Sequence, residues 1–240
     1  MVGNLSKFSI LVLLALIALL TTPVEAQRSS GLATDLADPR TVKVQRKVDE
    51  LYERGDFDRA YFIYRNELAP IGDKYAQYMV GYMHLTGMGT DEDPVAAYAW
   101  YRLAAERGTP EFVAVRDQLK HDLQAEERQR SDAYYLQLRR EFNDLVILLA
   151  AIKRNLPERR AVTGSRIATE SATISVVDTR TPSKRRSSAD YYGGIRRQLE
   201  ESLKMLAELG DFPDLETDPE RIDVDEIERL VNERIESPEG

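Results

Sequence analysis

Tyrosines, whose side chains are suited to binding other proteins, are clustered in one segment of this sequence. The chain has 12 tyrosines, and Tyr75, Tyr78, Tyr82, Tyr98 and Tyr101 lie close together along it. An aromatic ring with a hydroxyl offers a large contact area at a small cost in conformational entropy, which suits the binding of another protein. We therefore predict that Tyr75, Tyr78, Tyr82 and Tyr98 contact a protein partner where their rings are exposed. Other rings of the segment are expected to pack internally.

Residues that commonly catalyse reactions or hold metal ions are few. His84 and His121 are the only histidines, neither lies in a metal-binding or nucleophile motif, and the chain has no cysteine. The sequence also lacks the motifs of zinc metalloproteases, of serine hydrolases with a nucleophile at a sharp turn, and of phosphate-binding loops. We expect no catalytic residue, no cofactor and no metal ion, and an enzyme is the least favoured class of function.

An acidic cluster follows a pair of glycines. Asp91 and Asp93 alternate as the oxygen ligands of Ca²⁺ do, but the loop with a closing glutamate that such sites need is missing. Gly87 and Gly89 precede these carboxylates, which would repel a phosphate group. The glycine pair is therefore predicted to be a turn between two helices.

The first residues predict export. Lys7 precedes an apolar run over residues 8–20, and Val24-Glu25-Ala26 places small residues where a signal peptidase cleaves. The run is shorter than the roughly 20 residues of a membrane-spanning helix, and no cysteine follows it to carry a lipid. We expect a signal peptide at residues 1–26 and a flexible linker at residues 27–40. The mature protein would then be periplasmic or secreted, with no stable membrane anchor.

Charge is unevenly distributed along the chain, whose formal net charge is −8. Residues 211–240 carry 12 acidic residues against 3 arginines, whereas residues 153–197 carry 11 basic residues against 4 acidic ones. These two segments attract each other, bind separate partners, or are merely solvated. Within the basic stretch, Lys184, Arg185 and Arg186 are further candidate contacts for a protein partner. An acidic exported protein is not expected to bind nucleic acid.

The tyrosines lie in a region of predicted helix pairs. From near Thr41, apolar residues recur at helical spacing as far as Tyr52, and Gly55-Asp56 can end one helix and begin the next. A second helix runs from about residue 57 to residue 68. These two helices predict a hairpin whose apolar faces meet.

A second hairpin follows with clearer boundaries. Its first helix runs over about residues 74–85, and its second helix begins at Pro94, after Asp93 as N-cap, and ends before Gly108. Alignment of the two hairpins pairs Ala60 with Ala97, which indicates one repeated unit.

The second hairpin resembles a known family. The residues that carry the resemblance are Ala76-Gln77-Tyr78-Met79-Val80-Gly81-Tyr82-Met83, Gly87-Met88-Gly89, Asp93, Ala97, Trp100-Tyr101, Ala104-Ala105 and Gly108. They are similar to a Sel1-like repeat, a relative of the tetratricopeptide repeat, and residues 44–68 resemble a degenerate unit. The resemblance implies an all-α fold, a short α-solenoid of helical hairpins. Small residues such as Gly81 and Ala97 fit where helices approach closely, while Trp100 and Tyr101 fill the space between hairpins.

The remaining chain is predicted to cap and extend this stack. A helix from Thr109-Pro110 and an apolar helix over residues 134–152, ending near Leu156-Pro157, complete a repeat domain at residues 41–156. Residues 157–193 lack helical periodicity and are predicted to be a loop or disordered basic linker, with a β-prone run at residues 173–177.

Residues 194–240 are predicted to form two amphipathic helices with an acidic tail. The first has an apolar seam made of Ile195, Leu199, Leu203, Leu206 and Leu209. This seam needs a cover, which is the preceding cap helix, a second copy of the chain or a partner, and docking within the chain is preferred. The second helix is expected to begin at Asp223, whose side chain caps it.

These expectations favour a binding protein. The resemblance implies an adaptor that holds a partner protein, with a role in cell-envelope assembly or regulation. The alternative is a structural envelope component that self-associates, as a homodimer, through the seam at residues 195–209.

Overall fold

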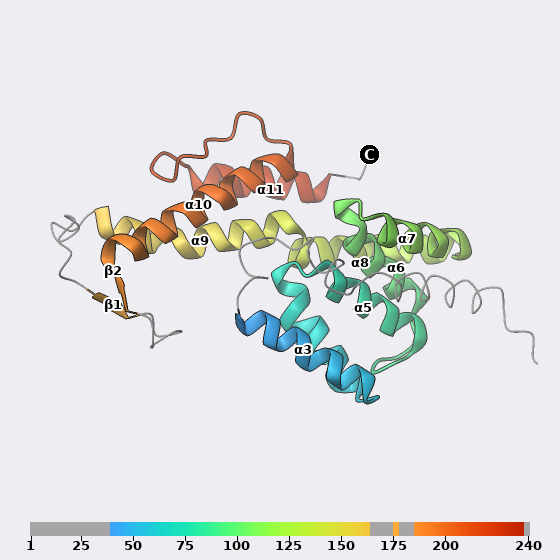
Figure 1. Cartoon of the computed structure of the whole chain (residues 1–240). Helices are drawn as coiled ribbons and strands as arrows, with labels where there is room; N and C mark the ends of the chain where they lie inside the picture. Colours follow the sequence, from blue (N-terminus) through green and yellow to red (C-terminus); the bar gives the residue numbers. More distant parts are fainter. Residues whose placement is uncertain (1–38, 164–174, 178–184, 238–240) are drawn as a thin grey trace, which may run out of the picture. The chain divides into compact units, whose positions relative to one another are not determined.

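The computed structural model describes residues 39–163, 175–177 and 185–237, with side chains for residues 40–156 and 190–237. Its contacts divide the chain into two compact units, with the boundary between Asn143 and Asp144. Both units are helical (Figure 1). The described elements of unit 1, residues 39–143, are α3 (Pro39–Glu53), α4 (Phe57–Ile63), α5 (Lys74–Thr86), α6 (Pro94–Ala104), α7 (Pro110–Asp122) and α8 (Ala125–Phe142).

The first hairpin of unit 1 is the pair α3 and α4. Gly55 adopts a φ of +77° between them, a left-handed conformation that glycine reaches without steric cost. Val48 and Leu51 of α3 are buried, as is Ala60 of α4. After α4 the helix widens into a π-helical turn, Tyr64–Leu68, followed by a 3-10 turn, Ala69–Ile71.

The second hairpin consists of α5 and α6, and both helices have an aspartate cap, of which only Asp93 was predicted. Asp73 caps α5 by accepting a hydrogen bond from the Ala76 backbone N–H, at 3.0 Å. Asp93 caps α6 by accepting from the N–H groups of Val95 and Ala96, at 2.9 and 3.1 Å. A 3-10 turn, Ala105–Arg107, ends this hairpin. The predicted helix pair at residues 74–108 is confirmed.

The third pair, α7 and α8, differs from the prediction at its end. A single apolar helix was expected over residues 134–152, but α8 ends at Phe142 and Asn143 takes an extended conformation with φ −65° and ψ 146°. The expectation of one helix is therefore wrong. Long-range contacts explain the break, because the Asn143 side chain donates a hydrogen bond to buried Glu106 while the Phe142 carbonyl accepts one from Gln77.

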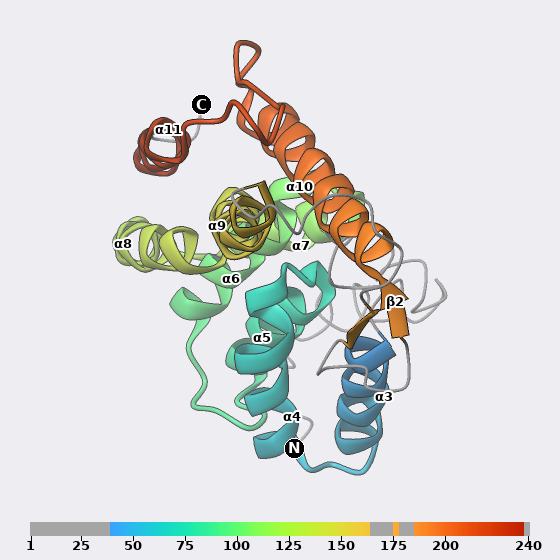
Figure 2. The ribbon, with the colours of Figure 1, turned by 90° about the vertical axis from the view of Figure 1, so that its left-hand side faces the viewer.

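Unit 2 contains α9 (Asp144–Thr163), α10 (Ser188–Gly210) and α11 (Val224–Glu236). Figure 2 shows α10 and α11 on two sides of α9, and both pack against that helix. A two-stranded antiparallel ribbon joins β1 (Ser175–Val177) to β2 (Arg185–Ser187), with Ser175 opposite Ser187. The predicted linker at residues 157–193 is thus shorter than expected, because α9 continues to Thr163 and α10 begins at Ser188. Residues 164–174 and 178–184 lie outside the described part.

The predicted seam of α10 is covered within unit 2. Leu199, Leu203 and Leu206 are fully buried, Ile195 is 8% exposed, and Leu209 at the end of the helix is 43% exposed. Since α10 packs against α9, docking within the chain is the arrangement observed. The seam is therefore not a free surface for self-association. Among the described helices, none is both long and apolar enough to cross a membrane.

Candidate functional site

The tyrosines of α5 lie on one face of this helix, at the spacing that helical geometry predicts for Tyr75, Tyr78 and Tyr82. The ring of Tyr78 stacks on the rings of Tyr101 and Phe112, with both centroid distances 5.3 Å. The ring of Tyr75 lies 6.4 Å from that of Tyr78. The face is therefore an internal aromatic layer that joins α5 to α6 and α7.

Most of the predicted contact tyrosines are buried. Tyr78, Tyr82 and Tyr98 are 4%, 8% and 5% exposed, so the expectation that these rings are available to a partner is wrong. The reason is the central place of α5 and α6, because α5 packs against α6 while α6 also packs against α7 and α8 and so buries nearly every face. Tyr98 is further covered by the Arg102 guanidinium, 5.6 Å from its ring centre. Only Tyr75 of this set is partly exposed.

The hydroxyl groups of this layer are close enough to influence one another. Burial raises the pKa of Tyr52, Tyr78 and Tyr101 above the ordinary value for tyrosine, and neighbouring tyrosine hydroxyls raise it further. A phenol with a raised pKa is neutral at every physiological pH. The layer therefore acts as packing, with its hydroxyl groups in the neutral form.

The basic candidate residues, Lys184, Arg185 and Arg186, lie outside the ranges with described side chains. Lys184 lies outside the described residues. Arg185 and Arg186 lie in β2, where Val177 and Val176 of β1 are their partners in register, and only their backbone is described. Their role as partner contacts stays a prediction.

The glycines of the repeat occupy positions that a side chain would disrupt. A Cβ at Gly81 would lie 2.8 Å from the Tyr101 ring, and a Cβ at Gly89 would lie 2.3 Å from the Phe57 carbonyl oxygen. Gly87, Gly89 and Gly108 have φ values of 68°, 72° and 70°. The turn after α5 thus touches the start of α4 directly, which joins the second hairpin to the first.

Trp100 lies at the centre of unit 1 and is fully buried, as is Ala97 on the same helix. Its ring centre is 5.2 Å from that of Phe142 on α8. The Arg65 guanidinium covers both rings, at 5.1 Å from the Trp100 centroid and 4.4 Å from the Phe142 centroid. Arg65 comes from the π-helical turn, so this cation–π stack joins the first hairpin to the second and third. Sequence reasoning missed Arg65, because its chain position does not reveal a partner on α8.

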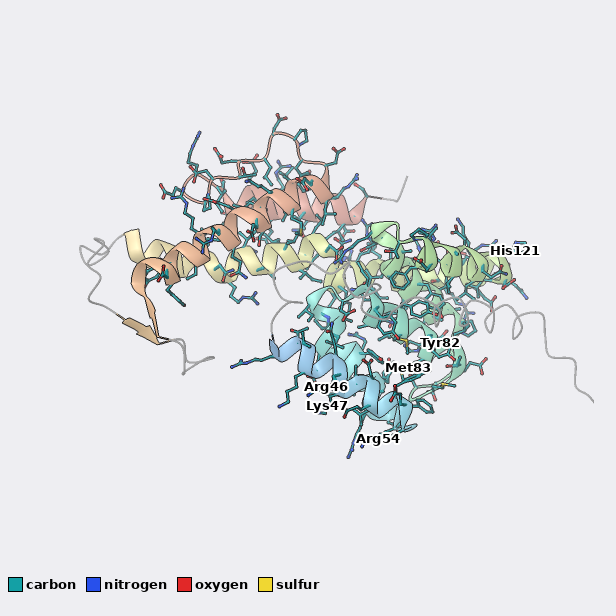
Figure 3. All side chains as sticks on the ribbon, in the orientation of Figure 1. Arg46, Lys47, Arg54, Tyr82, Met83 and His121 are labelled. Carbon is teal, nitrogen blue, oxygen red and sulfur yellow. The ribbon has the colours of Figure 1, made fainter. Side chains whose placement is uncertain are left out.

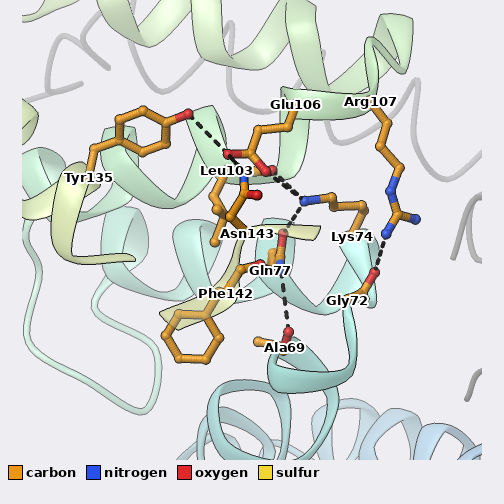
Figure 4. A network of polar contacts seen from close by, with 10 residues as sticks. All are labelled: Ala69, Gly72, Lys74, Gln77, Leu103, Glu106, Arg107, Tyr135, Phe142 and Asn143. Carbon is orange, nitrogen blue, oxygen red and sulfur yellow. Dashed lines mark hydrogen bonds and ion pairs between the residues drawn. The ribbon is translucent and has the colours of Figure 1, made fainter. Parts of the chain in front are cut away.

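A buried cation is a further feature that sequence reasoning missed (Figure 4). The side chain of Lys74 is 0% exposed, and its Nζ donates three hydrogen bonds. The acceptors are Gln77 Oε1 at 3.1 Å, the Leu103 carbonyl at 2.9 Å and Glu106 Oε2 at 3.1 Å. All three protons of the ammonium group are therefore used.

The network extends from Glu106 to the third hairpin. Glu106 Oε1 accepts hydrogen bonds from the Tyr135 hydroxyl at 3.2 Å and from Asn143 Nδ2 at 2.9 Å. Gln77 Nε2 donates to the Phe142 carbonyl at 3.3 Å. A buried network of this kind fixes one arrangement of the elements it joins. It holds α5, the end of the second hairpin and the end of α8 in register.

The two histidines differ in their surroundings, because His84 is partly buried and His121 is exposed. His84 Nε2 lies 3.1 Å from the Tyr61 hydroxyl, and burial lowers the His84 pKa from its ordinary value. His121 is exposed on α7. Within the described ranges, no group of three His, Asp or Glu side chains is placed to hold a metal ion.

The exposed face of α3 carries more basic than acidic residues. Arg46, Lys47 and Arg54 extend from this helix into solvent (Figure 3). The same helix exposes Val42 at 53%, and α4 exposes Phe62 at 59%. This face, unlike the tyrosine layer, is accessible to a partner.

Comparison with known proteins adds one result to this geometry. A family model described as the Sel1 repeat matches residues 74–109, which are α5, the glycine turn, α6 and the residues up to Thr109. The matched segment is the hairpin that contains the tyrosine layer and Trp100. No solved structure matches the chain.

Proposed function

Because the protein is a Sel1-like repeat protein, we propose that it is an exported adaptor that holds a partner protein in the cell envelope or outside the cell. Sel1 repeats generally mediate protein–protein interaction, and the repeat at residues 74–109 is built into a larger stack here. The single observation that supports the proposal best is this stack, in which Trp100 of α6 is fully buried against α8 and the π-helical turn.

A stack of this kind presents a rigid surface to a partner. The cation–π stack of Arg65 and the buried network of Lys74 fix the hairpins relative to one another. A preorganised surface binds a partner without losing much conformational entropy of its own. The fold of unit 1 is thus suited to holding a protein, and its exposed faces are where specificity would lie.

Export is the second part of the proposal, and it is tested by itself. The full-length chain with a tag at its C-terminus would be expressed in its native host, and the tagged protein would be isolated from each cell fraction and from the medium. We expect a mature protein that begins at Gln27, found outside the cytoplasm. A protein recovered only from the cytoplasm with its first residues intact would contradict the proposal.

The adaptor role is tested by reciprocal co-purification. The tagged full-length chain is expected to capture a partner in a fixed ratio, and the tagged partner is expected to capture this chain in return. Gly81→Asp, which places a charged side chain against the Tyr101 ring, should abolish capture. Leu209→Asp, at an exposed position of unit 2, should leave capture intact. No capture by the wild type would reject the adaptor role, and equal capture by the wild type and Gly81→Asp would reject the packed hairpin of unit 1 as its binding surface.

A further inference from the structure

The exposed side of α3 concentrates positive charge in a chain whose net charge is −8. The exposed basic residues of this helix and of the residue after it are Arg40, Lys43, Arg46, Lys47 and Arg54. The exposed acidic residues are Glu50 and Glu53. The first half of the helix therefore exposes four bases, from Arg40 to Lys47, and no acid. We call Lys43, Arg46, Lys47 and Arg54 the basic face.

The orientation of the basic face is fixed by the core. Val48 and Leu51 are buried on the opposite side of α3, and buried Gln45 donates a hydrogen bond to Asp73 Oδ2 at 2.9 Å. Because residues four and eleven apart lie on one line of a helix, Lys43, Lys47 and Arg54 form a stripe about 16 Å long. The stripe is therefore held in place before any partner arrives.

Local helix stability accounts for only one base of this face. Arg54, just after the end of α3, donates a hydrogen bond to the Glu50 carbonyl at 3.0 Å, and a cation at this end of a helix favours the helix dipole. Lys43, Arg46 and Lys47 lie outside the first and last turns of α3, so the helix dipole does not account for them.

Neighbouring groups leave most of this charge unneutralised. Arg46 lies 3.9 Å from Glu50, with both side chains well exposed, and such a pair is weak in water. The elements packed against α3 are α4 and the π-helical turn. Their exposed charged residues are Asp58, Arg59 and Glu67, and Arg59 pairs with Asp56, the residue just before α4, at 3.3 Å.

We propose that the basic face of α3 binds an acidic segment of the partner protein. This inference rests on the proposed adaptor function and names the chemistry of its partner. A protein segment fits better than a nucleic acid or an anionic membrane, because Glu50 and Glu53 interrupt the face and the whole chain repels a uniform polyanion. A protein can place carboxylates opposite the lysines and a cation opposite the two glutamates.

The experiment measures binding of a defined acidic probe to the full chain. A fluorescent peptide with glutamate at every third or fourth position is titrated with the protein, and a second peptide with glutamine in place of each glutamate is the control. Anisotropy is recorded at low and high salt. The variant Lys43→Glu with Lys47→Glu is compared with Lys120→Glu with Arg130→Glu. This matched pair makes the same change in net charge at exposed positions of α7 and α8.

We expect the acidic peptide to bind and the glutamine peptide not to bind. Two lost ion pairs correspond to about a tenfold weaker affinity for the α3 variant, and the α7 and α8 variant should stay within about twofold of the wild type. Binding should weaken as salt screens the charges. Equal weakening by both variants would overturn the proposal.

Two further arms identify the class of ligand. If single-stranded DNA or vesicles of phosphatidylglycerol bind more tightly than the peptide, with the same dependence on Lys43 and Lys47, the site is a general polyanion site and the proposal fails. The α3 variant is then used in the reciprocal co-purification. Retained capture of the partner would refute the basic face while leaving the adaptor function standing, whereas no capture by the wild type would refute the adaptor function itself.

Discussion

At Gly81 the second hairpin has no room for a side chain. The Cβ of an alanine there would lie 2.8 and 2.9 Å from two carbon atoms of the Tyr101 ring and 3.2 Å from the Ala97 carbonyl oxygen. Because the ring is fully buried and cannot move away, we expect Gly81→Ala to lower the free energy of unfolding by about 1–3 kcal/mol. Urea denaturation measures this loss.

The control for Gly81→Ala is Gly194→Ala in α10, where a Cβ meets no atom within 4 Å. Alanine favours the helical state there and should leave stability unchanged or raise it by up to about 1 kcal/mol. If Gly81→Ala left stability unchanged or raised it, as is expected for Gly194→Ala, the close approach of α5 and α6 at Gly81 would be refuted.

Among the polar side chains in the core of unit 1, replacement of Lys74 should lower stability the most. Lys74→Met leaves the Glu106 carboxylate, which is 13% exposed, without its cation. Loss of one partner of a buried pair lowers stability by about 3–5 kcal/mol. The double variant Lys74→Met with Glu106→Gln should recover part of this loss, because the buried charge is gone and an amide oxygen can still accept from Tyr135 and Asn143. Additive effects in this cycle would show that the two groups are not coupled.

His84 gives unit 1 a pH dependence with a definite sign. Burial lowers the pKa of His84 below its ordinary value of 6.5, although nearby Asp93 opposes the shift. The unfolded chain then binds more protons at this residue than the folded protein does. The contribution of His84 to stability is therefore complete above about pH 6.5 and is lost as the pH falls below that value.

We expect His84→Gln to reduce the loss of stability between pH 7.5 and pH 5. Denaturation midpoints at several pH values measure this slope. His121→Gln removes an exposed imidazole from α7 and serves as the control for the substitution itself. A slope that is identical for wild type and His84→Gln would contradict the burial of this ring.

At the scale of elements, α10 tests whether unit 2 is held together by its apolar seam. Leu203 is fully buried whereas Leu209, nearly two turns later in α10, is 43% exposed. Leu203→Asp should destabilise unit 2 by about 3 kcal/mol or more, since it buries a charge and removes a packed side chain. Leu209→Asp should change stability by less than about 0.5 kcal/mol. Helicity followed through urea denaturation decides between these outcomes.

Short-range signals predicted most of the helices correctly. Asp93 as N-cap, Pro94 at the first helical position and Gly108 after the last turn are local features, and the structure has the helix ends there. The break at Asn143 could not be predicted this way, because residues 134–152 read as one apolar helix. The break depends on Glu106 and Gln77, which lie on other helices.

At the scale of the whole molecule, two spectroscopic probes should distinguish the unfolding of unit 1 from that of unit 2. Trp100 is the only tryptophan of the chain and lies in unit 1. Its fluorescence therefore follows unit 1, while circular dichroism follows the helices of both units. We expect Leu203→Asp to shift part of the dichroism transition and leave the fluorescence midpoint unchanged, and Gly81→Ala to shift the fluorescence midpoint. Coincident shifts of both probes for both variants would mean that the chain unfolds as one cooperative unit.

The charge segregation along the chain has a partial structural counterpart in unit 2. Lys153, from the basic stretch, forms an ion pair of 2.6 Å with Glu228 of the acidic tail. Both side chains are about 40% exposed, so one such pair contributes little to stability. The two segments therefore attract each other at this point of contact.

The sequence by itself determined the helix pairs, their caps, the repeat at residues 74–109 and the need of the α10 seam for a cover, because these follow from local propensity and periodicity. Only the tertiary structure decided which tyrosines are buried, that Lys74 lies in the core and which bases of α3 are exposed. Burial is a property of the residues that surround a side chain, and in a stack of hairpins those neighbours come from elements far away in the sequence.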